Sequence, residues 1–337
     1  MGAQEIDYVE LYTADAEAMT DYFRSDLGFA LVARSAGPGR DSVLLRQGTA
    51  RLVVTTGEVT GAFVEQHGDG IADVAFRCDD VTATRQGALA AGAVDADVPH
   101  GGPAVSGFGS VVHTLLPATG TADGLPAGFG WVPSGESRGE RPERIALLDH
   151  IAVCVERGSL DSYADFYAAG FGLTRYSAES VRVGASSMES VVVRSDSDGV
   201  TFTLVAPGPS EGSGQLDAFL SRNDGPGVQH LAFLVDDIVA AVREAERVEF
   251  LNTPGTYYDA LGSRLAGMRE EIADLRATNV LADRDEWGYL LQLFTRSPHP
   301  RDTLFYELIQ RRGSRGFGSN NIRALYEAVE LDRLAAR

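Results

Sequence analysis

The stretch Leu148-Asp149-His150-Ile151-Ala152-Val153-Cys154 reads as a mainly apolar β-strand, and a similar stretch, Ile6-Asp7-Tyr8-Val9-Glu10-Leu11-Tyr12, opens the chain. Each is followed by an acidic, Ala-rich helical segment that ends in an aromatic pair and a Gly-containing turn. The turns are Leu27-Gly28-Phe29 in the front half and Phe171-Gly172-Leu173 in the back half. Such self-similarity indicates a chain built from two related halves.

Two further pairs of segments repeat in the same order. Ser42-Val43-Leu44-Leu45-Arg46 matches Ser190-Val191-Val192-Val193-Arg194. Gly70-Ile71-Ala72-Asp73-Val74-Ala75-Phe76 matches Gly227-Val228-Gln229-His230-Leu231-Ala232-Phe233, and both are followed by two Asp residues and an Ala-rich helical stretch. Strand-like segments that alternate with helical ones predict an α+β fold, with two βαβββ modules in each half.

Composition along the chain predicts the domain borders. We expect an N-terminal domain at 1–133, a hydrophilic linker at 134–144 and a C-terminal domain at 145–337. A helix with one apolar face is expected at about 320–335. Because it follows the last strand of the back half, it would either pack on the sheet or cover a site there as a lid.

The bulk properties narrow the class of protein. A chain of 337 residues can form two domains with full cores. Its net charge of −19 argues against nucleic acid and anionic membrane surfaces as partners, because both attract clustered cations. No apolar run approaches the roughly 20 residues of a membrane span, and no secretory signal is visible, so we expect a cytoplasmic protein. Cys78 and Cys154 lie in apolar strands and are expected to be buried free thiols.

Three side chains able to bind a metal lie inside strand-like runs of the back half: His150, His230 and Glu307. Their intervals are too long for a spacing motif, so they gain meaning only if the repeat brings the strands together. Two histidines and one carboxylate leave coordination positions open, as in the ligand set of non-haem Fe(II) oxygenases. The front half has Tyr8 and Asp73 where the back half has His150 and His230, so we expect it to have lost the ligands.

A lone histidine on a strand is more often a hydrogen-bonded core residue than a ligand. His150 and His230 differ because they occupy equivalent positions in strands that open successive modules. His113 ends Gly109-Ser110-Val111-Val112-His113, which we match with Gly288-Tyr289-Leu290-Leu291-Gln292, and it is expected to be structural. The remaining histidines lie in polar loops and are expected to be solvated: His67, His100 and His299.

Two competing chemical roles have weaker support in the sequence. Glu307 could form a salt bridge to Arg311 or Arg312 instead of binding a metal, although a buried carboxylate needs a partner in either case. The pattern G-x-S-x-G occurs at 135–139 and 208–212, but both matches lie in polar, Gly-rich loops and do not predict a nucleophile elbow.

These segments resemble the 4-hydroxyphenylpyruvate dioxygenase family of the vicinal-oxygen-chelate superfamily, and the likeness covers nearly the whole chain. The matching strings are Gly-Val-Gln-His-Leu-Ala (227–232), Phe-Leu-Asn-Thr-Pro-Gly-Thr-Tyr-Tyr (250–258), Gly-Tyr-Leu-Leu-Gln-Leu-Phe-Thr (288–295), Thr-Leu-Phe-Tyr-Glu-Leu-Ile-Gln-Arg (303–311) and Gly-Phe-Gly (316–318). The resemblance implies two tandem vicinal-oxygen-chelate domains, each with paired βαβββ modules in a half-barrel sheet, and a C-terminal lid helix.

Members of this family use 4-hydroxyphenylpyruvate and O₂ in two ways. The dioxygenases hydroxylate the ring and make homogentisate, whereas the 4-hydroxymandelate synthases hydroxylate the benzylic carbon. The chain resembles the synthase branch more closely. It carries Ile322 after Asn320-Asn321, where dioxygenases have Phe, and Thr203 opens Thr-Leu-Val-Ala-Pro (203–207), where dioxygenases have Pro. Ala206 departs from the Glu that is usual in both branches.

The resemblance implies a cofactor and a set of site residues. Fe(II) would be held by His150, His230 and Glu307, and the chain would act as a homodimer. Residues implied in catalysis or in binding 4-hydroxyphenylpyruvate are Ser190, Thr203, Gln292, Phe317 and Ile322. The slim Ile322 would let the benzylic carbon of the substrate, and not its ring, approach the iron.

Two alternative functions are also compatible with the sequence. The chain could be a dioxygenase that makes homogentisate from the same substrate. It could also be a metal-free ligand-binding protein, because related βαβββ folds sequester antibiotics without catalysis. The intact His150, His230 and Glu307 argue against this second alternative.

Overall fold

The computed structural model describes residues 2–121, 124–136, 142–183, 186–209, 214–268, 271–318, 320–321 and 323–324. Ile322 and most of the helix predicted at about 320–335 lie outside these ranges, as does the middle of the linker predicted at 134–144.

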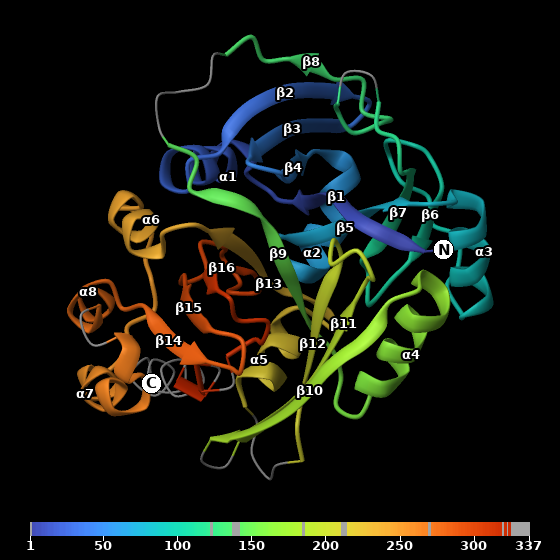
Figure 1. The fold of residues 1–337 in the computed structure, drawn as a ribbon. Helices are drawn as coiled ribbons and strands as arrows, with labels where there is room; N and C mark the ends of the chain where they lie inside the picture. The colour runs from blue at the N-terminus through green and yellow to red at the C-terminus, as the bar shows by residue number, and fades with distance from the viewer. Residues whose placement is uncertain are drawn as a thin grey trace.

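Two eight-stranded sheets form the frame of the molecule, one in each half (Figure 1). The front-half sheet has the order β6-β7-β5-β1-β4-β3-β2-β8, with β1 Ala3–Tyr12, β2 Ala30–Gly37, β3 Arg40–Gln47, β4 Ala50–Thr56, β5 Gly70–Cys78, β6 Ala104–Ser106, β7 Val112–Pro117 and β8 Val132–Pro133. The back-half sheet has the order β10-β11-β12-β9-β13-β16-β15-β14, with β9 Ile145–Cys154, β10 Thr174–Val183, β11 Ser186–Arg194, β12 Thr201–Pro207, β13 Gly227–Val235, β14 Leu281–Arg284, β15 Tyr289–Phe294 and β16 Phe305–Arg312.

Both sheets are built on an antiparallel pair of central strands, β1 with β5 and β9 with β13. A parallel neighbour flanks each central strand, namely β4 and β7 in the front half and β12 and β16 in the back half. This topology confirms the predicted α+β repeat. One back-half strand is reduced in the front half. At the place where the back half has β14, the front half has only a single β-bridge, between Asp95 and Val105. The sequence match of His113 with the segment that forms β15 was wrong. His113 lies on β7, and β7 pairs in parallel with β5 as β16 pairs in parallel with β13.

The helices connect the strands and cover the sheets. They are α1 Ala16–Asp21 continued by the π-helix η1 Tyr22–Asp26, the 3₁₀ helices η2 Glu58–Thr60 and η3 Ala266–Met268, and α2 Gly61–His67, α3 Val81–Ala90, α4 Leu160–Phe171, α5 Gln215–Arg222, α6 Ile238–Glu244, α7 Gly255–Arg264 and α8 Ile272–Ala277. No helix within the described ranges has the length and apolar character needed to cross a membrane.

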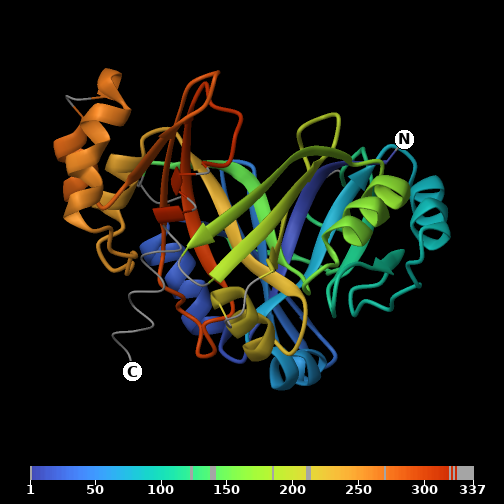
Figure 2. The same ribbon diagram turned by 90° about the horizontal axis from the view of Figure 1, so that it is seen from below.

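Helix α3 of the front half and α4 of the back half lie side by side (Figures 1 and 2). Their approach depends on two glycines, because a Cβ at Gly170 would lie 3.1 Å from the Ala88 Cα, and one at Gly87 would lie 3.1 Å from the Gly170 carbonyl oxygen. Small residues at this crossing therefore let the two helices pack closely.

One apolar core also joins the halves. On β9, Ile151 and Val153 belong to this core, whereas His150 points to the opposite face, because successive side chains of a strand alternate. Aromatic rings from both halves meet in the core. The ring centres of Phe29 and Phe233, for example, lie 5.6 Å apart. Burying one such ring contributes roughly 1.5–3 kcal/mol. The face that carries His150 holds the candidate site.

Candidate metal centre

Three neighbouring strands bring two imidazoles and one carboxylate together. His150 lies on β9, His230 on β13 and Glu307 on β16. Ala232 is the register partner of both His150 and Glu307, and His230, two residues earlier, points to the same face. The Nε2 atoms of His150 and His230 lie 3.4 and 3.2 Å from Oε2 of Glu307. All three side chains are buried, so the repeat does bring the predicted ligands to one point.

The far nitrogen of each imidazole has its own partner. Nδ1 of His150 lies 2.9 Å from Oδ1 of Asp149, and Nδ1 of His230 lies 3.2 Å from Oε1 of Gln229. Both oxygens accept hydrogen bonds, so each Nδ1 carries a hydrogen and Nε2 faces Glu307. An outer acceptor that fixes a ring in this way is typical of metal-binding histidines. The donor set and its orientation therefore fit a divalent metal ion.

The charges of the three groups are coupled. Burial lowers the pKa of His150, but the Glu307 carboxylate and the hydrogen bond to Asp149 raise it to about 9. Burial raises the pKa of Glu307, but the charge of His150 and hydrogen bonds from both histidines lower it to about 2. The carboxylate is thus held in its charged form, and a divalent ion would replace the proton on His150, since metal ligands bind deprotonated.

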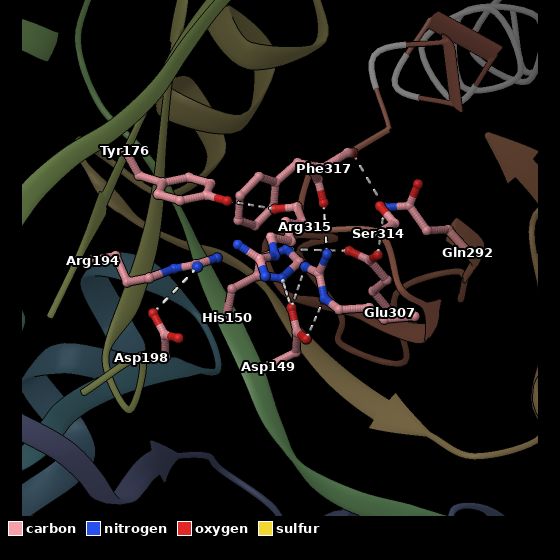
Figure 3. Close-up of polar contacts among 12 residues, drawn as sticks. Asp149, His150, Tyr176, Arg194, Asp198, Gln292, Glu307, Ser314, Arg315 and Phe317 are labelled. Carbon is pink, nitrogen blue, oxygen red and sulfur yellow. Dashed lines mark hydrogen bonds and ion pairs between the residues drawn. The ribbon is translucent and has the colours of Figure 1, made fainter. Parts of the chain in front are cut away.

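Asp149 connects His150, beside which it lies in Figure 3, to the guanidinium of Arg311. Arg311 donates from Nε and Nη2 to the two oxygens of Asp149, at 2.8 and 2.7 Å. Although burial raises the pKa of Asp149, Arg311 and His150 hold it well below its usual range. Arg311 also donates to the Gly316 carbonyl at 2.7 Å and lies 5.2 Å from the centre of the Phe317 ring. One side chain therefore positions both a candidate ligand and the Gly-Phe-Gly segment.

Gln292 connects the candidate carboxylate to the C-terminal segment. Its Nε2 donates to Oε1 of Glu307 at 2.8 Å, and its Oε1 accepts from Nδ2 of Asn321 at 2.9 Å. Gly318 has φ +74°, and a Cβ there would lie 2.3 Å from Oε1 of Gln292, so this position requires glycine. The Gln292 amide is therefore engaged with protein groups, which adds a positioning role to the substrate role expected from sequence.

A cavity of ≈ 350 Å³ opens beside the three side chains. Its lining contains four of the five pocket residues expected from sequence, namely Ser190, Thr203, Gln292 and Phe317, while Ile322 lies outside the described residues. The buried Thr203 Oγ1 has no hydrogen-bond partner among the described residues. It is therefore free to bind a polar group of a molecule in the cavity.

Sequence reasoning missed several neighbours of the site. Phe305 stacks on His230 with ring centres 4.9 Å apart, and Phe294 also lines the cavity. The suggested salt bridge from Glu307 to Arg311 or Arg312 was wrong, because Arg311 pairs with Asp149 instead. The sequence feature that could have indicated the Arg311–Asp149 pair is the acidic residue directly before His150.

Three histidines expected to be solvated are buried. Each ring is hydrogen-bonded instead: His67 to the Asn223 carbonyl and Ser110, His100 to Tyr8, and His299 to Tyr306. His67 is the last residue of helix α2 and does not lie in a loop, whereas the loops that carry His100 and His299 are covered by the rest of the fold. His113 is structural as predicted, since it contacts the Val74 carbonyl and the Tyr167 hydroxyl. Cys78 and Cys154 are buried free thiols, also as predicted.

We expect Gln292→Leu to weaken metal binding roughly 10–100-fold, because Oε1 of Glu307 loses the donor that orients it. A competition titration against a coloured chelator measures this affinity. Gln310→Leu is the matched control on β16, since Gln310 accepts from the Ile238 amide at the start of α6 and donates to the Asp236 carbonyl. Unchanged affinity in Gln292→Leu would show that this amide does not hold the ligand.

Comparisons with known proteins agree with this geometry. Residues 1–117 match the family model of the hydroxyphenylpyruvate dioxygenase N-terminal domain, and residues 147–293 match that of the glyoxalase/bleomycin resistance protein/dioxygenase superfamily. The 4-hydroxyphenylpyruvate dioxygenase of Yarrowia lipolytica is 30% identical over 97% of this chain and 91% of its own length. The Neurospora crassa enzyme of the same name is 32% identical over 80% of this chain and 71% of its own.

A solved structure of a mutant 4-hydroxymandelate synthase from Streptomyces coelicolor is 48% identical to this chain. It covers 99% of this chain and 100% of its own, with a TM-score of 0.90. The chain therefore belongs to the 4-hydroxyphenylpyruvate dioxygenase family.

Proposed function

We propose that this chain is a 4-hydroxymandelate synthase. It would convert 4-hydroxyphenylpyruvate and O₂ to 4-hydroxymandelate and CO₂, by oxidative decarboxylation and hydroxylation of the benzylic carbon. The observation that carries the proposal is the buried triad of His150, His230 and Glu307 at the wall of a cavity, in a chain 48% identical to a synthase.

We propose Fe(II) as the ion of this site, held by His150, His230 and Glu307. Iron would supply the activation of O₂ and take part in the oxidation of the keto acid. Two neutral imidazoles and one carboxylate satisfy three coordination positions and leave others for substrate and O₂. Asp149 and Gln292 would keep the ligands in place through their hydrogen bonds.

The chain's own residues would bind and orient the substrate. Phe294, Phe305 and Phe317 give the cavity an apolar wall that fits an aromatic ring and excludes water. The unpartnered Thr203 hydroxyl and Ser190 are the candidate donors to substrate oxygens. Because a misplacement of about 1 Å changes rates by orders of magnitude, these contacts would decide which carbon is hydroxylated.

Product identification tests the proposal. 4-Hydroxymandelate and homogentisate are isomers, so mass alone does not distinguish them, and chromatography against both standards is required. The expected result with iron-loaded protein is 4-hydroxymandelate as the main product. Homogentisate as the main product would overturn the proposal in favour of the dioxygenase function named for the relatives at 30% and 32% identity.

We expect Ile322→Phe to shift the product toward homogentisate, because a larger side chain would press the ring of the substrate toward the iron. Its chain neighbour Asn321 is buried and donates to Gln292, which lines the cavity. The measurement is the ratio of the two products. Ile322→Leu is the control, since it keeps the side-chain volume and should keep the product. An unchanged ratio in Ile322→Phe would show that this position does not steer the reaction.

Two finer parts of the proposal have other support: the homodimer rests on the family resemblance alone, and the cytoplasmic location rests on the sequence, in which no membrane span or secretory signal is visible. Light scattering of the purified chain tests the first. A metal-free binding protein is not supported, because the three candidate ligands are intact and converge.

A further inference from the structure

The front half contains a second buried cluster of side chains able to bind a metal. Glu10 on β1, Asp73 on β5 and His100, from the loop between α3 and β6, offer ligand atoms that all lie within 4.8 Å of one another. Asp73 occupies the place on its sheet that His230 occupies in the back half. Glu10 is the register partner of Asp73, whereas Ala152 is the register partner of His230. The front half has thus gained a carboxylate at a position where the back half has a methyl group.

Nε2 of His100 faces both carboxylates and also the Tyr8 hydroxyl, which lies 3.2 Å from Nε2 and 3.3 Å from Oδ2 of Asp73. Nδ1 lies 3.0 Å from the Gly101 carbonyl oxygen, which can only accept, so Nδ1 carries a hydrogen. Nε2 lies 3.4 Å from Oδ2 of Asp73 and 3.8 Å from Oε2 of Glu10. The ring is stacked on Phe129 with centres 4.5 Å apart. The distances from Nε2 of His100 to the two carboxylate oxygens are close to the 3.2–3.4 Å that separate the imidazole nitrogens from Oε2 of Glu307 in the back half.

Two buried carboxylates beside an imidazole nitrogen form an environment that attracts a cation. Glu10 and Asp73 are 1% and 2% exposed, so solvent does not screen their charges. Burial and the facing Asp73 raise the pKa of Glu10 to about 7. A cation between the two carboxylates would relieve their repulsion.

The charge balance of the two clusters is the same. In the front half, the positive charge of Arg40 lowers the pKa of Glu10. In the back half, the carboxylates of Glu307 and Asp149 face one guanidinium, Arg311. With neutral imidazoles, each cluster has one excess negative charge. A divalent ion would therefore meet a similar net charge in both clusters.

Outer hydrogen bonds already hold the carboxylates. Thr55 donates to Oε1 of Glu10 at 2.6 Å, which leaves Oε2 as the oxygen nearest His100. Thr114 donates through its amide and its hydroxyl to the two oxygens of Asp73, at 2.9 and 2.6 Å. Metal-binding carboxylates are commonly supported in this way.

We propose that Glu10, Asp73 and His100 bind a second divalent metal ion, which stabilises the front half. Two carboxylates and one imidazole form a harder ligand set than the back-half triad and suit an ion such as Mn²⁺. All three side chains are buried, so the ion has a structural role. The proposal does not depend on the proposed function, because it concerns different side chains on the other sheet.

Counting bound Mn²⁺ in the full chain tests the proposal. Metal-stripped protein is titrated with Mn²⁺, and free ion is followed by electron paramagnetic resonance. Two ions per chain are expected in the original protein and one in Glu307→Gln, whose front half is unaltered. Asp73→Asn should also bind one ion, and the double variant none. Glu17→Gln, at an exposed position of α1, is the matched control and should bind two.

Thermal unfolding gives a second readout. Mn²⁺ should raise the unfolding temperature of Glu307→Gln but not that of Glu307→Gln combined with Asp73→Asn. If Asp73→Asn fails to fold, Glu307→Gln alone decides the matter. No Mn²⁺ bound to folded Glu307→Gln would overturn the proposal and leave a proton as the cation of the front-half cluster.

Discussion

A Glu307→Gln variant is expected to lose iron from the back-half site and with it all measurable turnover, while it keeps its fold. The amide has nearly the same shape as the carboxylate but carries no charge, and Glu307 is the one anion of the triad. Its Oε2 lies within 3.4 Å of both candidate histidine ligands. Losing it should cost more affinity than the roughly 10–100-fold typical of losing an outer hydrogen bond.

Two measurements test the effect of Glu307→Gln. Visible absorption of a keto acid chelated to Fe(II) reports the back-half site alone, and chromatography of the products reports turnover. Glu271→Gln is the control, because this partly exposed carboxylate pairs with Arg312 at the surface. Turnover near that of the original chain in Glu307→Gln would remove Glu307 from the ligand set and refute the proposed mechanism.

Replacement of Arg311 by Leu should have the largest effect on stability. It leaves the buried Asp149 carboxylate without its bidentate partner, and breaking such a pair costs about 3–5 kcal/mol. The same change removes the hydrogen bond to the Gly316 carbonyl and the guanidinium that lies over the Phe317 ring. Phe317 lines the cavity, so the cavity wall should shift and kcat/KM should fall. Denaturant unfolding gives the stability, and steady-state kinetics give the activity.

The neighbouring arginine provides a matched control. Arg312 pairs with Glu271 and its side chain is 39% exposed, so Arg312→Leu should cost only about 0–1 kcal/mol. Arg311→Lys should fall between the two Leu variants, because an ammonium keeps the charge but cannot match both oxygens of Asp149. Equal, small losses in Arg311→Leu and Arg312→Leu would contradict a special role for Arg311.

The repeated strand segments made the fold predictable. Their order fixed the α+β repeat, and the equivalent positions of His150 and His230 singled these residues out from the other histidines. Glu307 followed because an acid in an apolar strand needs a partner. These inferences depend on patterns within single strands, which the sequence displays directly.

Features that depend on contacts between distant segments were not predictable. Arg311 reaches Asp149 because β16 and β9 both flank β13, and no local pattern encodes that register. His67 and His299 were expected in solvent because their segments are polar, yet the other half of the chain covers them, through Asn223 in one case and Asp69 in the other. His100 was misjudged for a related reason, since its loop folds back on Tyr8.

The core that joins the halves has a consequence for how this family varies. Tyr306 precedes Glu307, and its ring lies 5.1 Å from that of Phe23 in the front half, while its hydroxyl contacts His299. A substitution at Phe23 therefore acts on the backbone next to a candidate ligand. Chimeras that exchange one half between relatives should suffer from such epistasis, so the two halves are constrained to diverge together.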